Sequence, residues 1–123
     1  MRRSGYTLNE LIIVVIIIGV IVSMALPRYS SLMERMRSAE GVETLTALLN
    51  AEKMYFIDND RYTSNMSELD VEIPTSNIFS PPELSDDPAQ LASVRRITGE
   101  YYLYINANGA ISCTGDLCSR LGY

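Results

Sequence analysis

The fold is decided by the stretch LIIVVIIIGVIVSMAL, from Leu11 to Leu26. It carries no charged side chain over sixteen residues. With Leu8, the apolar segment approaches the ~20 residues that a helix needs to cross a hydrocarbon core of about 30 Å. Good helix formers continue from Arg28 to Phe56. The sequence therefore predicts one long helix, whose first half belongs in a membrane or in a protein core that replaces it.

The composition argues against a nucleic-acid-binding protein and against an enzyme. Ten basic and fifteen acidic residues give a net charge of -5, the opposite of a basic nucleic-acid surface. There is no His and a single Lys, so the commonest general base and the commonest metal ligand are missing. No nucleophile has a base beside it, and there is no Gly-rich phosphate loop. We expect no catalytic residue, no metal site, no cofactor and no direct nucleic-acid partner.

Two arginines, Arg2 and Arg3, precede the apolar segment and place the amino end on the cytoplasmic side of a membrane. Three interpretations fit such a segment. It is an uncut signal anchor, or a secretory signal peptide cut after Ala25, because Ser23-Met24-Ala25 has the small-x-small pattern. The third interpretation depends on Glu10: an ordinary signal peptide would gain nothing from Glu10, and an anchor would gain nothing from the Gly5-Tyr6 junction.

A carboxylate such as Glu10 costs about 2 to 3 kcal/mol near a membrane centre and less near an interface, so it is usually paired or functional. A cut between Gly5 and Tyr6 would leave an α-amine on Tyr6 that is positively charged near neutral pH. That amine would lie one helical turn from Glu10 of the same chain, or would face Glu10 of a neighbouring subunit. A buried pair of this kind specifies register more than it stabilises.

The hexapeptide GYTLNE, Gly5 to Glu10, followed by the apolar segment resembles the class III signal of type IV pilins and the related pseudopilins. The usual pattern there is Gly, then Phe-Thr-Leu-x-Glu, then a long apolar run, and Tyr6 stands where Phe is commoner. The resemblance implies cleavage after Gly5, N-methylation of Tyr6 and a role for Glu10 in subunit assembly. Pro27 falls where the family commonly has a helix-kinking proline.

The resemblance implies a structural subunit, most like a small type IV pilus subunit, that polymerises through its N-terminal helix into a surface filament. Its implied partners are other copies of itself, the prepilin peptidase/methyltransferase, the assembly machinery of the inner membrane, and membrane lipid before assembly. The implied location is the inner membrane for the monomer and then an extracellular filament on the bacterial surface.

Two alternatives stay open: a type II secretion pseudopilin, and a small secreted or membrane-anchored binding domain. The major pseudopilin usually carries a Trp-containing segment and a calcium site near its C-terminus. This chain has no Trp and has two cysteines there, which favours a pilus subunit.

The predicted helix has two weak points, Gly19 and Pro27, because proline lacks a backbone donor and kinks a helix. We expect the helix to bend or lose hydrogen bonds between them in an assembled filament. From Ser31 onward the pattern becomes amphipathic, with charged residues mainly off the apolar stripe. The predicted stripe is Leu32, Met36, Ala39, Val42, Leu45, Leu48, Leu49 and Phe56, and the charged residues off it are Glu34, Arg35, Glu43, Glu52 and Lys53.

The rest of the chain predicts a small head of the α+β class, with the long helix packed on an antiparallel sheet of about three to four strands. Turn formers end the helix near Asp58, and residues 72–87 show no periodicity. Strands are expected at residues 91–98, 101–105 and 110–113. The predicted divisions are a leader, 1–5; the apolar half of the helix, 6–27; its amphipathic half, 28–57; and the head, 58–123.

The two cysteines, Cys113 and Cys118, lie close together in CTGDLC. Without His or further Cys they cannot complete a structural zinc site, and their spacing is not Cys-x-x-Cys. Outside the cytoplasm they should form a disulfide that closes a tight loop, as many pilins have near the C-terminus. The loop-entropy estimate is about 2 kcal/mol, which matters for a small head with a thin core.

Overall fold

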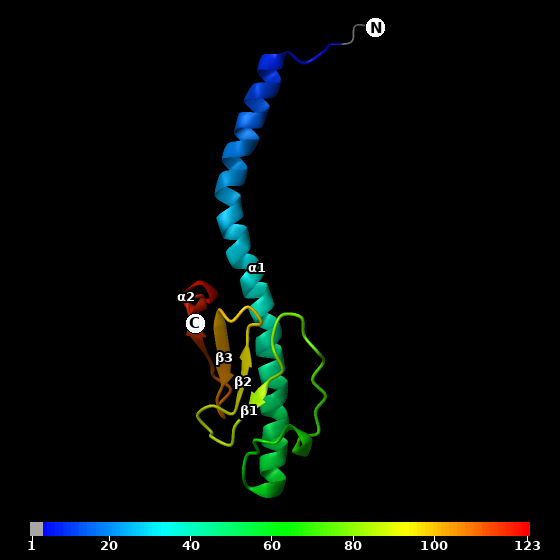
Figure 1. The fold of residues 1–123 in the computed structure, drawn as a ribbon, viewed down its shortest axis with the longest axis vertical. Coiled ribbons are helices and arrows are strands. Elements are labelled where there is room, and N and C mark those ends of the chain that lie inside the picture. Colours follow the sequence, from blue (N-terminus) through cyan, green and yellow to red (C-terminus); the bar gives the residue numbers. More distant parts are fainter. Residues whose placement is uncertain (1–3) are drawn as a thin grey trace. The chain divides into compact units, whose positions relative to one another are not determined.

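The computed structural model describes residues 4–123, so Arg2 and Arg3 of the predicted leader lie outside the described residues. The chain separates into two compact units, Met1–Met33 and Glu34–Tyr123. Helix α1, Leu8–Asn59, contributes to both units (Figure 1). The long helix expected from the sequence is therefore confirmed, and each unit is described by itself below.

Helix α1 ends two residues beyond the predicted boundary at residue 57. It ends at Asn59 because Asp60 adopts a left-handed backbone conformation, with φ of 55°, which a helix cannot continue. It is unbroken through Gly19 and Pro27.

The sheet of the second unit is antiparallel, with the strand order β1-β2-β3-β4. The strand β3 lies where the sequence predicted it, β2 is shorter than predicted and β4 is shifted toward the C-terminus. The short β1 lies inside residues 72–87, where no periodicity indicated a strand. The bounds are Glu83–Leu84 for β1, Ala92–Arg95 for β2, Tyr101–Ile105 for β3 and Ile111–Gly115 for β4.

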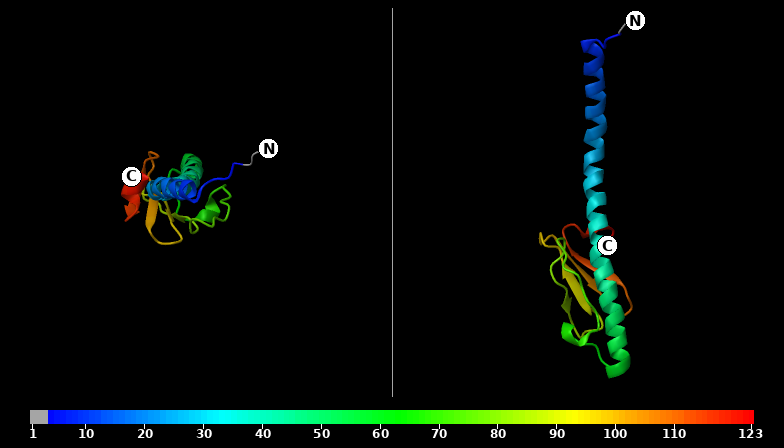
Figure 2. Two further views of the ribbon diagram at one scale, coloured as in Figure 1. Left: turned by 90° about the horizontal axis from the view of Figure 1, so that it is seen from above. Right: turned by 90° about the vertical axis from the view of Figure 1, so that its right-hand side faces the viewer.

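The core of the head lies between α1 and one face of the sheet, and Figure 2 shows the sheet against one side of the later part of α1. Alternation along β3 places Tyr101, Leu103 and Ile105 in the core, each at most 1% exposed. Helix α1 contributes three leucines, Leu45, Leu48 and Leu49. Two short helical turns complete the head: the 3-10 helix η1, Met66–Glu68, and α2, Cys118–Leu121.

The predicted apolar stripe of α1 is correct in its centre and wrong at its ends. Leu32 and Met36 remain 55% and 62% exposed, and Phe56 is 37% exposed. The charged residues Glu34 and Glu52, expected mainly off the stripe, lie on the covered side instead, Glu52 at 0% exposure and Glu34 only partly exposed. The buried positions of α1 are Ser38, Gly41, Leu45, Leu48, Leu49 and Glu52.

The covered face of α1 begins at two small residues, Ser38 and Gly41. A Cβ atom on Gly41 would lie 2.9 Å from the Phe79 ring and 3.0 Å from Leu103. Gly41 therefore lets the helix backbone approach the sheet more closely than any larger residue would. The hydropathy pattern could not reveal this, because Gly and Ser carry almost no apolar signal.

Candidate assembly interface

The apolar segment is exposed along its whole length in the isolated chain. Its large apolar side chains, from Leu11 to Leu26, are each between 44% and 69% exposed. Within residues 4–123, α1 is the one helix long and apolar enough to cross a membrane, and none of its most apolar window is buried. The first unit therefore lacks a covering surface of its own.

The predicted cleavage junction lies outside regular secondary structure. The backbone is irregular from Ser4 to Thr7, and Gly5 and Tyr6 are both exposed, Tyr6 at 85%. Exposed irregular backbone of this kind is where proteases cut most readily. The structure thus leaves the Gly5-Tyr6 bond accessible.

Glu10 has a partner that the sequence analysis missed. Its Oε2 accepts a hydrogen bond of 2.9 Å from the backbone N–H of Thr7, and the Thr7 Oγ1 accepts one of 3.3 Å from the Glu10 N–H. This reciprocal pair is a capping box at the start of α1. The signal was present in the sequence, because Thr7-Leu8-Asn9-Glu10 has the T-x-x-E pattern of such a cap.

The structure does not bring Tyr6 and Glu10 together in the uncut chain. Among residues 4–123, the carboxylate of Glu10 is bonded to Thr7 alone. The α-amine that would pair with Glu10 does not yet exist, because the Tyr6 nitrogen is still in a peptide bond. The Tyr6 and Glu10 pairing stays a prediction for the processed chain.

Gly19 and Pro27 lie within the unbroken helix, and the predicted loss of hydrogen bonds concerns the assembled form. Among the described residues, no atom beyond the adjoining residues and the surrounding helix backbone lies within 4 Å of a Cβ built on Gly19. Pro27 has no N–H, so the carbonyl of Ser23 lacks its usual helical donor. Hydroxyls gather around this position: Ser23 donates to the carbonyl of Val20 at 2.7 Å, and Ser30 donates to that of Pro27 at 3.0 Å.

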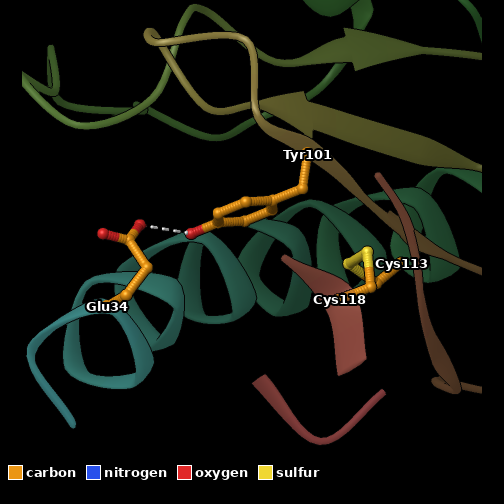
Figure 3. The surroundings of a disulfide bond; sticks show 4 residues. All are labelled: Glu34, Tyr101, Cys113 and Cys118. Carbon is orange, nitrogen blue, oxygen red and sulfur yellow. Dashed lines mark hydrogen bonds between the residues drawn. A yellow bond between two sulfur atoms is a disulfide. The ribbon is translucent and has the colours of Figure 1, made fainter. Parts of the chain in front are cut away.

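A polar cluster ties the start of the second unit's helix to its sheet. Glu34 Oε1 accepts hydrogen bonds from Arg96 Nε at 2.8 Å and from the Tyr101 hydroxyl at 3.0 Å, while Oε2 accepts one from Arg37 at 3.2 Å. Figure 3 shows the bond between Glu34 and Tyr101. Arg96 is 8% exposed and also donates to the carbonyl of Ile78. The contacts of Glu34 with Arg96 and Tyr101 join residues more than sixty positions apart.

The contacts in this cluster shift the pKa values of Glu34 and Tyr101. Burial alone would raise the pKa of Glu34, but the hydrogen bonds from Arg96, Tyr101 and Arg37 outweigh it and hold the pKa below its ordinary value of 4.5. Burial, followed by the hydrogen bond to the Glu34 carboxylate, raises the pKa of the Tyr101 hydroxyl. Glu34 is therefore kept ionised and Tyr101 neutral.

A second buried carboxylate lies near the end of α1. Glu52 is 0% exposed; its Oε2 accepts a hydrogen bond of 3.0 Å from the Thr63 N–H, and its Oε1 has no partner among the described residues. The Thr63 hydroxyl donates to Glu68. Burial raises the pKa of Glu52, and the nearby negative charge of Glu68 adds to the rise. The hydrogen bond from Thr63 lowers the pKa of Glu68.

The predicted disulfide between Cys113 and Cys118 is confirmed. It joins β4 to the first residue of α2, and Cys118 is 9% exposed (Figure 3). The short helix α2 is thereby tied to β4, which is an edge strand of the sheet.

Several known proteins are similar to this chain. The type IV major pilin protein PilA of Myxococcus xanthus is 38% identical over 68 residues, which is 55% of this chain and 31% of that protein. The type II secretion system core protein G of Aeromonas hydrophila is 36% identical over 77 residues, 61% of this chain and 54% of that protein. These matches cover between about a third and about a half of the two relatives.

A longer match supports the same relationship. The type II secretion system core protein G of Klebsiella michiganensis is 31% identical over 111 residues, 84% of this chain and 76% of that protein. No family model matches the chain, and no solved structure matches it. The long apolar helix, the antiparallel head and these similarities together place the chain in the family of type IV pilins and type II secretion pseudopilins, whose members are structural, non-enzymatic proteins.

Proposed function

We propose that the chain is a type IV pilus subunit that is cut after Gly5, methylated at Tyr6, and polymerised through Leu11–Leu26 into a helical surface filament. The observation that carries the proposal is the exposure of the whole apolar segment beside a head with its own core. Burial of apolar surface is worth roughly 25 cal/mol per Å², so this segment favours lipid or like segments over water.

The proposed order of events assigns a place to each division of the chain. Residues 1–5 are removed as a leader by the prepilin peptidase/methyltransferase. Residues 6–27 hold the monomer in the lipid of the inner membrane and later form the filament core. Residues 28–57 and 58–123 carry the head, and the assembly machinery of the inner membrane moves the subunit from lipid into the extracellular filament.

Glu10 sets the register of docking in this proposal. In the uncut chain its carboxylate caps α1 through Thr7. Cleavage creates a positively charged amine on Tyr6, and charge-assisted hydrogen bonds are roughly twice as strong as neutral ones. We expect the amine of the same subunit or of a neighbour to compete for the carboxylate. Gly19 and Pro27 supply the bend or local melting that lets the helices fit together in the filament.

The experiment that tests the function is a quantification of surface filaments in the organism that makes the protein. Replacement of Glu10 by Ala should leave membrane insertion intact while filament yield falls sharply. The matched control is Glu43→Ala, because Glu43 is an exposed carboxylate of the same helix. Normal filaments in the Glu10→Ala cells would refute the register role, and wild-type cells without filaments containing this chain would refute the pilus subunit.

A second candidate function is that of a type II secretion pseudopilin. It is favoured by one observation, the 84% coverage of this chain by the match to core protein G of Klebsiella michiganensis. Deletion of the gene distinguishes the two. A pilus subunit predicts lost surface filaments with unchanged protein secretion, and a pseudopilin predicts retained exoproteins in cells whose pili are normal.

A further inference from the structure

The head contains an open apolar cavity that the filament core does not use. Its volume is about 460 Å³, within the ~300 to 1,000 Å³ range of pockets that bind ligands. Its lining includes Thr44 of α1, the buried Phe79 and Val94, and also Val71, Ile73 and Pro82. We call this cavity the loop pocket.

The same head exposes large apolar side chains near the end of α1. Met54 is 70% exposed and Ile57 is 81% exposed. Residues three apart are neighbours on a helix surface, so the two form one patch, and the exposed Lys53 lies beside it in the chain. We call Met54 and Ile57 the helix-end patch. Exposed apolar patches often mark interaction sites.

Charge distinguishes the surroundings of the pocket from those of the patch. The chain from Tyr62 to Val94 has six acidic residues and no basic one. Two of them, Asp70 and Glu72, are exposed and flank the pocket residue Val71. The patch has Lys53 on one side and the exposed Arg61 just after the helix, although Asp58 and Asp60 also lie near it.

The occupant of the pocket follows from these features. We call Asp70 and Glu72, the exposed chain neighbours of Val71, the acidic rim. We propose that, in the filament, the helix-end patch of one subunit inserts into the loop pocket of a neighbouring copy, with Lys53 beside the acidic rim. This contact rests on the proposed function, because it needs subunits held side by side. Patch and pocket are different surfaces of one head, so the contact is heterologous, the kind of contact that can repeat from copy to copy along an open helical filament.

The contact also answers an electrostatic problem of the filament. Residues 34–123 carry fourteen acidic and seven basic side chains, so neighbouring heads repel one another. A contact that places Lys53 of one head beside the acidic rim of the next favours one relative orientation, since opposite charges favour one register and like charges disfavour others.

Cross-linking of the full chain in living cells tests the contact. The test variant carries Ile57→Cys with Thr75→Cys, because Thr75 is exposed and lines the pocket. The control variant carries Ile57→Cys with Thr98→Cys, because Thr98 is equally exposed in the turn after β2. After mild oxidation of sheared filaments, the test variant should give a ladder of dimers, trimers and longer oligomers, whereas the control should give no ladder, because the contact does not bring its two cysteines together.

Each other outcome is decisive. Filaments that form with the test variant but give no ladder overturn the contact and leave the proposed function intact. Absence of filaments from wild-type cells removes both the function and the contact. A ladder of equal strength in the control would also overturn the contact, because it would show unspecific collision of heads.

A charge substitution gives an independent readout should the cysteines disturb assembly. Ile57→Glu places a carboxylate against the acidic rim and should lower filament yield about tenfold or more, the loss expected when a central interface residue is removed. The control is Ile97→Glu, because Ile97 is 54% exposed on another part of the head. Equal yields of the two variants, with equal melting temperatures of their heads, would contradict the contact.

Discussion

Both halves of α1 carry large apolar side chains, but these side chains lie in opposite environments. Between Leu11 and Leu26 every large apolar side chain is at least 44% exposed, whereas Leu45 and Leu48 are fully buried. The difference lies in what the chain supplies to cover them. The sheet of the head covers the later half, and the proposed cover for the first half is lipid or other copies of the chain. The chain thus joins a head with a buried core to an apolar helical segment that the chain itself leaves uncovered.

The largest expected effect on stability comes from shortening an apolar side chain to alanine, which should matter in the later half of α1 and not in the first half. Leu48→Ala should lower the free energy of unfolding of the head by about 2 to 5 kcal/mol, because it opens a cavity in a closed core. Val15→Ala is the control, since Val15 is 67% exposed. Thermal unfolding of both proteins in detergent checks this. A Val15→Ala protein as unstable as Leu48→Ala would show that the first half also supports the head.

Removal of the Glu34 carboxylate from its polar cluster should have the second-largest effect on stability. Glu34→Ala leaves the guanidinium of Arg96 buried without its carboxylate, which costs about 3 kcal/mol at the low end of such losses because Glu34 is partly exposed. The pH dependence has a definite sign. Because the folded pKa of Glu34 lies below 4.5, its contribution is present above pH 4.5 and is lost as the pH falls through the lowered value.

Denaturant unfolding of wild type and Glu34→Ala between neutral and acidic pH measures this. The difference between the two proteins should shrink in acid. A constant difference would mean that Glu34 acts by packing and not by charge.

The disulfide should contribute about 2 kcal/mol to the head by the loop-entropy estimate. Reduction with a thiol should lower the melting temperature of the head and leave insertion of the apolar segment in membranes unchanged. The double variant Cys113→Ser with Cys118→Ser controls for effects of the reductant elsewhere. A melting temperature that is insensitive to reduction would show that α2 does not need to be tied to β4.

The smallest effect concerns Glu52, whose folded pKa is raised. A raised pKa means that its contribution to stability is full below 4.5 and is lost as the pH rises through the folded value. Glu52→Gln keeps an acceptor for the Thr63 N–H and should flatten this decline. Glu43→Gln, at an exposed position, should not. Parallel pH profiles of wild type and Glu52→Gln would mean that the ionised carboxylate is satisfied by a group such as water.

Sequence reasoning succeeded where the signal is local. A few neighbouring residues are enough to predict three features: the apolar segment, the strand β3 between its two turns, and the disulfide between the closely spaced cysteines. It failed for Glu34 and Glu52, which were placed on the solvent side because charge usually faces water. The partner that buries Glu34 is Arg96, sixty-two positions away, and no periodicity reveals such a pairing.

Other features were missed for different reasons. The two-residue strand β1 is too short to show alternation, and it exists because β2 offers it a partner. Thr7 can be found from the sequence, since its spacing from Glu10 is that of a capping box, but the hexapeptide also fits a processing signal and an assembly role for Glu10, and these interpretations hide the cap. We propose that the same residues also act as a processing signal, so that one hexapeptide would serve both purposes at different stages of the subunit's life.

The proposed role of the apolar segment in assembly is tested most directly by the mass of the N-terminal peptide of the protein recovered from the cell surface. A peptide that begins at Tyr6 and carries one added methyl group is the expected result, because the proposed subunit loses residues 1–5 and keeps its apolar segment. A peptide that begins at Leu26 would contradict it, since the head would then be released without the segment through which it is proposed to polymerise.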